Sequence, residues 1–154
     1  MPPHRAFEIR RDRQLAQFRT PVWKLQKRER PRDQRPGMDP EHLANIRKLP
    51  CTLCGEIKFT QAHHLQSGPA RKERGLGLKA TDRWALSICP WHHEDLHRYG
   101  SRKECDYFAA FGIDCYELAN GLWSRRGSVE DMARVLLAHQ IAASAQKART
   151  SQPY

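Results

Sequence analysis

Two short runs of apolar and β-branched residues flank a polar stretch in the middle of the chain. Residues 57–65, IKFTQAHHL, and residues 83–88, RWALSI, have the composition of strands. The intervening residues 66–82 contain three glycines and a proline, which predicts a long polar loop. Loops of this length inside a compact domain are usually functional. The pattern therefore predicts a strand pair whose connection carries function.

A helix is predicted directly after the second strand. Pro90 suits the first turn of a helix, and Gly100 is a typical residue just past a helix end. Ser101 and Glu104 then have the spacing of a capping box, which predicts a further helix that ends before Gly112.

Two more helices are predicted toward the C-terminus. Asp114 opens one that covers residues 116–123, and Ser128 opens the longest helix of the chain. In the longest helix, Met132, Val135 and Leu136 fall at helical spacing, so we expect them to pack against the centre of the protein.

These elements divide the chain into four parts and predict an α+β fold. Residues 1–48 are charged and broken by prolines, with few apolar residues, and are expected to be a basic, largely disordered arm. Residues 49–100 form the predicted core with its strands and helix. Residues 101–147 form a C-terminal helical extension, and residues 148–154 a frayed tail.

The charge of the chain favours a polyanionic partner. Lys and Arg number 27 against 17 Asp and Glu, a net charge of +10. Residues 1–48 hold 13 of the basic residues and 6 of the acidic ones, so the excess is concentrated there. Nucleic acid is the first partner that such a distribution indicates, although a plain linker is a competing interpretation of the arm.

The sequence contains no apolar run long enough for a transmembrane helix, and its first residues lack the apolar core of a signal peptide. No membrane association is therefore expected, and the expected location is a reducing cytoplasm. In that setting a Cys-x-x-Cys pair indicates zinc before a disulfide.

Four residues in two matched pairs predict a structural zinc site. Cys51 and Cys54 form one pair, and Cys89 and His92 form the other. Three thiolates and one imidazole are a typical closed, tetrahedral ligand set for Zn²⁺. Cys105 and Cys115 follow no such pattern and are expected to be core residues.

Five histidines form two clusters, which are His63 and His64 at the end of the first strand and His92, His93 and His97 on the helix. His93 and His97 are four residues apart, so they share one helix face and can chelate a divalent ion. His92 points about 100° away, toward the cysteines. The reverse assignment, with His93 on zinc, loses the four-residue pairing and ranks second.

The first cluster suits hydrolysis of a phosphodiester bond. One of His63 and His64 is expected to bind the metal and the other to act as a general base. Neighbours on a regular strand point to opposite faces, so both reach one site only if the strand end is twisted or bulged. The residues alone leave open which histidine takes which role.

Over about residues 51–98 the chain resembles the HNH, or ββα-metal, nucleases in their zinc-knuckle version. The resemblance implies a zinc-stapled ββα-metal core in which His63 binds the catalytic ion and His64 is the general base. It matches His93 to the metal ligand on the helix. His97 matches a further ligand found in colicin-type DNases.

Several motifs are also similar to those of a phage and prophage group, the Ref-like RecA-dependent nucleases. These motifs are His63-His64-Leu65, Gly75-Leu-Gly-Leu-Lys79, Asp82-Arg-Trp84, Cys89-x-x-His92-His93, Leu96-His97-Arg98, Gly112-Ile-Asp114 and Leu122-Trp123. This likeness implies a link to DNA recombination and makes a RecA-type recombinase filament a candidate partner beside DNA.

One position departs from the HNH pattern. Trp84 stands where the family has an asparagine that fixes the loop by hydrogen bonding. Two substitutes for that support are Asp82, as in the Ref-like pattern, and packing by Trp84 itself.

Basic residues near the predicted metal site are candidates for contact with DNA. Arg98 follows His97 and could neutralise the scissile phosphate, and the others are expected to grip the DNA backbone. Solvated surface charge is an even alternative for each of them. The set is Arg71, Lys72, Arg74, Lys79, Arg83 and Arg98.

The sequence thus predicts a metal-dependent DNA endonuclease with a structural Zn²⁺ and a catalytic Mg²⁺ or Mn²⁺. The three imidazole ligands are also compatible with Zn²⁺ or Ni²⁺ at the catalytic position. A zinc-stapled module that binds DNA or a recombinase without chemistry is the alternative from another class. An RNase is a weaker third hypothesis.

Overall fold

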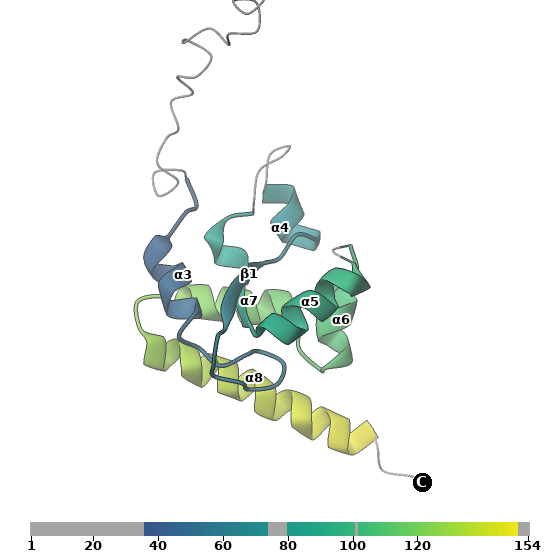
Figure 1. The fold of residues 1–154 in the computed structure, drawn as a ribbon. Coiled ribbons are helices and arrows are strands. Elements are labelled where there is room, and N and C mark those ends of the chain that lie inside the picture. The colour runs from purple at the N-terminus through teal and green to yellow at the C-terminus, as the bar shows by residue number, and fades with distance from the viewer. Residues whose placement is uncertain (1–35, 74–79, 101, 151–154) are drawn as a thin grey trace, which may run out of the picture. The chain divides into compact units, whose positions relative to one another are not determined.

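The computed structural model describes residues 36–73, 80–100 and 102–150, which form an α+β fold around a two-stranded sheet (Figure 1). The helices are α3 (Pro40–Ile46), α4 (Gly68–Glu73), α5 (Pro90–Tyr99), α6 (Glu104–Ala110), α7 (Cys115–Ser124) and α8 (Val129–Thr150). The strands are β1 (Gln61–His64) and β2 (Ala85–Ile88), and a short 3₁₀ helix, η2 (Asp82–Trp84), precedes β2.

The two strands pair antiparallel in regular register. His63 lies opposite Leu86 and His64 opposite Ala85, and the Leu65 N–H extends the ladder by donating to the Trp84 carbonyl at 2.9 Å. No bulge interrupts this ladder. The four pairs therefore have the register of a regular strand, and His63 and His64 meet different partners, Glu104 and Asp82.

The core lies between the sheet and the C-terminal helices. The four residues of β2 are all buried, and α7 packs against β2, η2 and α8. The largest fully buried apolar side chains are Ile46, Leu49, Leu65, Leu86, Ile88, Leu96, Phe108, Leu118, Leu122, Met132 and Leu136. In Figure 1, α8 runs beneath α7 and beneath the turns of residues 51–60 that lead into β1, here called the cysteine knuckle.

Helix boundaries agree well with the sequence signals on the C-terminal side. The helix α5 starts at Pro90 and ends before Gly100, as predicted. Asp114 caps α7 by accepting hydrogen bonds from two backbone N–H groups of the first turn, and Ser128 accepts one from Asp131 at the start of α8. The helix α8 continues to Thr150, three residues past the predicted boundary at 147.

The prediction of a disordered arm over residues 1–48 is wrong for its last part. Asp39 caps α3 through the His42 N–H, and Pro40 occupies the first helical turn. Ile46 and Leu49 are fully buried, so this short helix contributes to the core. Few apolar residues suffice here because α3 packs against both strands of the sheet. Residues 1–35 lie outside the described residues.

Both predicted strands are shorter in the structure than in the sequence pattern. Residues before Gln61 belong to the turns of the cysteine knuckle, where Ile57 and Phe59 are exposed rather than packed in a sheet. Asp82 and Trp84 belong to η2, in which the Trp84 N–H bonds the Thr81 carbonyl. The predicted loop over 66–82 likewise contains α4, with residues 74–79 outside the described part.

Candidate functional site

The Cys51, Cys54, Cys89 and His92 side chains converge on one point, with their ligand atoms all within 4.8 Å of one another. The Cys89 sulfur lies 3.2 Å from His92 Nδ1 and 3.9 Å from the Cys54 sulfur. Three thiols and an imidazole at this spacing fit a tetrahedral Zn²⁺. The structure thus brings together the four residues that the sequence pairs predicted, and they could hold a structural metal such as zinc.

Local backbone structure explains why these ligands meet. Gly55, with φ of 74°, closes the knuckle turn after Cys54, and its N–H bonds the Cys51 carbonyl at 2.9 Å. The Thr52 N–H donates to the Ser87 carbonyl of β2 at 2.9 Å. The knuckle is therefore attached to the strand that leads directly into Cys89.

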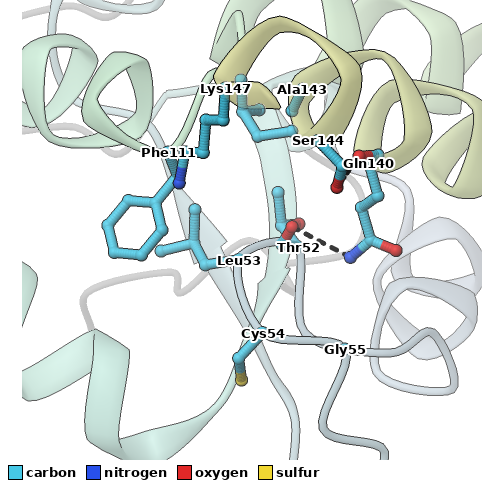
Figure 2. A pocket seen from close by; sticks show the side chains of 10 residues that line it. Thr52, Leu53, Cys54, Gly55, Phe111, Gln140, Ala143, Ser144 and Lys147 are labelled. Atoms are coloured by element: carbon cyan, nitrogen blue, oxygen red, sulfur yellow. Dashed lines mark hydrogen bonds between the residues drawn. The ribbon is translucent and has the colours of Figure 1, made fainter. Parts of the chain in front are cut away.

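The long helix α8 also holds the knuckle. The Gln140 amide donates to the Cys51 and Thr52 carbonyls, each at 3.0 Å, and Figure 2 shows this side chain reaching the knuckle from α8. Leu53, Phe111 and Lys147 surround the adjoining cavity of about 240 Å³. The cavity lies beside the cysteine cluster, since Cys54 lines it, and the described lining residues include no histidine.

Burial affects the protonation of the cluster in the protein without metal. It lowers the pKa of His92, against an opposing effect of Asp95, and so favours the neutral imidazole that a metal requires. Burial, together with the neighbouring Cys51 and Cys89 thiols, raises the pKa of Cys54 to about 11 although a backbone N–H opposes it. Zinc binding would therefore have to displace protons from the thiols.

His63, His93 and His97 form a second cluster. The ring centroid of His93 lies 4.6 Å from that of His97 and 5.2 Å from that of His63, and the His63–His97 separation is 6.3 Å. Burial, then the charges of His63 and His97, lowers the pKa of His93. Among the described residues, only the ligand atoms of the cysteine cluster all lie within 4.8 Å of one another. The three histidines are therefore more widely spaced than the four ligands of that cluster.

Glu104 also belongs to this site, although its spacing from Ser101 predicts a helix-capping role. Its carboxylate is fully buried and accepts a hydrogen bond from His63 Nε2 at 3.3 Å. It also accepts from the Ser67 N–H at 2.6 Å, the Ser67 hydroxyl at 2.8 Å and the Gln66 N–H. Burial alone would raise the pKa of Glu104, but the bonds from His63, Gln66 and Ser67 outweigh it and lower this pKa.

The capping-box interpretation of Glu104 is therefore wrong. The helix α6 begins at Glu104 itself, after Lys103 at the cap, and the carboxylate turns inward to β1 instead of back along its own helix. Ser101 lies outside the described residues. No sequence signal distinguishes an inward-facing acid from a capping one, because both stand in the first turn.

His64 faces a different partner. Its Nε2 lies 2.7 Å from Asp82 Oδ1, and the Asp82 side chain is only 1 % exposed. A carboxylate can only accept, so Nε2 carries the proton and Nδ1 is the basic nitrogen. Asp82 is fixed in turn, because its other oxygen accepts from the Asp39 N–H at 2.7 Å and its own N–H donates to the Gly37 carbonyl at 2.8 Å.

Trp84 supports α4 rather than His64. Its indole N–H donates to Glu73 at the end of α4, at 2.7 Å, and its ring meets the Tyr116 ring edge-on at 5.8 Å. The Thr81 hydroxyl donates to the same Glu73 carboxylate at 3.1 Å. Asp82 and Trp84, the two candidates to replace the asparagine of the HNH pattern, thus have separate functions. Asp82 contacts His64, and Trp84 holds α4 in the polar segment of residues 66–82.

The predicted DNA-contacting residues differ in their surroundings. Arg71 and Lys72 are exposed on α4, and Arg98 is exposed on α5, where it pairs with Glu94. Arg83 instead donates to Asn120 of α7 at 2.8 Å and lies over the Trp84 ring, so it contributes to the fold. Arg74 and Lys79 lie outside the described residues.

None of the described helices combines the length and apolar character needed to cross a membrane. Comparison of the chain with protein-family models, with curated proteins and with solved structures found no match. The function must therefore be argued from the cysteine cluster, which could hold a metal, from the group of His63, His93 and His97, and from the residues that hold them.

Proposed function

We propose that the chain is a metal-dependent DNA endonuclease of the HNH type, which hydrolyses phosphodiester bonds and contains a structural zinc. The observation that carries this proposal is the different surroundings of two adjacent histidines. His64 bonds the buried carboxylate of Asp82, which can orient a general base. His63 instead faces the imidazole rings of His93 and His97. Hydrolysis of a phosphodiester needs both a base and a cation, and neighbouring residues supply candidates for each.

His64 is the proposed general base. Asp82 holds the Nε2–H and so orients the ring and leaves Nδ1 free to take a proton from water. The ionised carboxylate also stabilises the imidazolium that forms, as in other carboxylate–histidine pairs. The His64 side chain is 17 % exposed, so water and substrate can reach it.

His63, His93 and His97 are the proposed ligands of a catalytic divalent ion. Three protein ligands, with a further position taken by water or substrate, are the usual coordination of a catalytic metal. Glu104 accepts the Nε2–H of His63 and thereby leaves Nδ1 as the nitrogen for a metal, which is the usual arrangement around metal-bound histidines. When bound, such an ion supplies positive charge to the scissile phosphate and the leaving oxygen.

The charges on α4 and α5 support a polyanionic substrate. Arg71 and Lys72 are exposed on the segment that Trp84 and Glu73 hold beside η2, and Arg98 follows His97. The net charge of +10 acts in the same direction. The likeness to the Ref-like group extends the proposal to substrates formed in recombination, with a RecA-type filament as the candidate partner.

Nicking of supercoiled plasmid tests the proposal. The zinc-loaded protein is assayed with Mg²⁺ or Mn²⁺, with and without EDTA, and then on single strands, on RNA and on recombinase filaments that contain a displacement loop. We expect metal-dependent cleavage, and we expect His64→Ala to reduce its rate by about 10²–10⁴-fold. His139→Ala, which changes a histidine of α8 that belongs to neither cluster, is the matched control and should retain activity.

Full cleavage by His64→Ala would rule out the assignment of the base. Absence of cleavage on every substrate, with retained binding, would instead support the non-catalytic DNA- or recombinase-binding module. Cleavage confined to RNA would favour the RNase.

A further inference from the structure

The fold brings together two cysteines that have no partner in the sequence pattern. Cys105 belongs to α6 and Cys115 opens α7, and their sulfurs lie 3.5 Å apart. The other described cysteines, Cys51, Cys54 and Cys89, all belong to the zinc cluster. The pair is thus separate from the metal ligands.

The surroundings leave one thiol accessible and the other enclosed. Cys105 is partly buried, whereas Cys115 is 2 % exposed. Both line an open cavity of about 400 Å³ together with Asp106, Gly112 and Tyr116. A small reagent can therefore approach Cys105 from solvent, with Cys115 directly behind it.

Cys105 also has polar neighbours. Its thiol donates to the Tyr116 hydroxyl at 2.7 Å and lies 3.2 Å from the Ser67 hydroxyl. Sulfurs in a disulfide are about 2 Å apart, so bond formation requires the two to approach by roughly 1.5 Å. Rotation of the Cys105 side chain toward Cys115 would give up the contacts with Ser67 and Tyr116.

We propose that Cys105 and Cys115 are a site of reversible disulfide formation, by exchange with a low-molecular-weight disulfide such as oxidised glutathione. The disulfide links α6 to α7. It forms whether or not the chain hydrolyses DNA, because neither thiol belongs to the zinc cluster or to the histidine group.

The exchange proceeds in two balanced steps. The Cys105 thiolate attacks one sulfur of the small disulfide, whose S–S bond breaks to release one small thiolate and leave a mixed disulfide. Cys115 then loses its proton and attacks the Cys105 sulfur, which displaces the second small thiol. The two protein thiols lose two electrons and two protons in total, and the small disulfide gains both.

The order of the steps follows from exposure. Cys105 is the thiol that a reagent can reach, and burial, followed by the adjacent Cys105, raises the pKa of Cys115. A thiol of this kind is a poor first nucleophile but a well-placed second one, because the mixed disulfide forms beside it.

Peptide mapping of the zinc-loaded full chain tests the site. Trypsin places both cysteines in one peptide, residues 104–125, and separates it from residues 49–58 and 84–98, which carry the zinc ligands. The protein is incubated with oxidised glutathione, denatured, alkylated with N-ethylmaleimide and digested. We expect peptide 104–125 to lose two hydrogens and take up no label, to recover both labels after reduction, and the other two peptides to be labelled throughout.

Serine variants test the order of the steps. In Cys115→Ser, a glutathione adduct should accumulate on Cys105, whereas in Cys105→Ser the buried Cys115 should stay unmodified. Retention of two labels by oxidised wild-type peptide 104–125, a stable glutathione adduct in the wild type, or a crosslink to Cys51, Cys54 or Cys89 would each overturn the proposal. The wild-type measurement decides the matter even if a variant fails to fold.

Discussion

The Glu104 carboxylate connects three parts of the chain at the scale of single residues. It accepts hydrogen bonds from His63 of β1 and from Gln66 and Ser67 at the start of the polar connection. A buried charge costs much free energy unless it is fully hydrogen-bonded, and here both oxygens have donors. Glu104 therefore fixes the His63 ring relative to the backbone of Gln66 and Ser67.

Replacing this charge should reduce stability in a pH-dependent way. Glu104→Gln should lower the free energy of unfolding by about 2 kcal/mol at neutral pH, because the charge-assisted bonds are lost. The pKa of Glu104 is lowered below its ordinary value of 4.5, so the stabilisation is present above that pH and disappears as the pH falls through the lower folded value.

Urea unfolding of both proteins from pH 7 downward measures the effect. The difference between them should shrink below about pH 4.5. Glu94→Gln, an exposed acid on α5, is the control and should change stability little at any pH. A difference between Glu104→Gln and wild type that is constant with pH would contradict the role of the charge.

At the scale of elements, contacts with the rest of the protein set the position of α4, which lies in the polar segment of residues 66–82 between the strands. Glu73 at its end bonds the Trp84 indole, and Gly68 at its start lies against the Tyr116 side chain of α7. Gly68 has a φ of 54°, so glycine is needed there both for its backbone and for the space it leaves. These contacts give α4, and with it the exposed Arg71 and Lys72, a defined position.

Substitution at the start of α4 should disturb this arrangement. In Gly68→Ala the new Cβ would overlap the Tyr116 ring in a left-handed conformation, and we expect a loss of about 2 kcal/mol in unfolding free energy. Gly127→Ala is the matched control, because a Cβ there has open space. Its effect should stay within about 0.5 kcal/mol. Equal stability of the two variants in urea would contradict the packing described for Gly68.

At the scale of the whole molecule, the cysteine cluster joins distant parts of the chain. The knuckle lies before β1, Cys89 and His92 lie at the start of α5, and Gln140 of α8 holds the knuckle from the other side. In the part of the chain that the structure describes, the sheet has two short strands, so a metal at this point would contribute much of the stability. Its loss should therefore affect the entire fold.

Metal analysis and thermal unfolding test this role. Cys51→Ser should lose bound zinc, and its Tm should fall by at least roughly 10 °C. Cys105→Ser, a matched substitution outside the cluster, should retain zinc and nearly the wild-type Tm. His93→Ala should also retain this zinc, because His92 is the imidazole in the cluster. Loss of zinc from His93→Ala but not from Cys51→Ser would contradict the assignment.

The elements that local signals specify were predictable from the sequence. Pro90 and Gly100 mark α5, Asp114 caps α7, and the paired spacing of Cys51 with Cys54 and of Cys89 with His92 predicts the cluster. These features depend on neighbours within a few residues, where backbone geometry and ligand spacing leave few alternatives.

Contacts between residues far apart in the chain were decided only by the tertiary structure. Glu104 meets His63, Asp39 holds Asp82, and Cys105 approaches Cys115 because helices pack on a sheet at particular positions. Short segments such as α3 become ordered through that packing and not through their own propensity. The sequence by itself determined the helix ends and the ligand pairs of the cysteine cluster, because these depend on near neighbours. The fold determined which distant residues meet, because only packing brings them together.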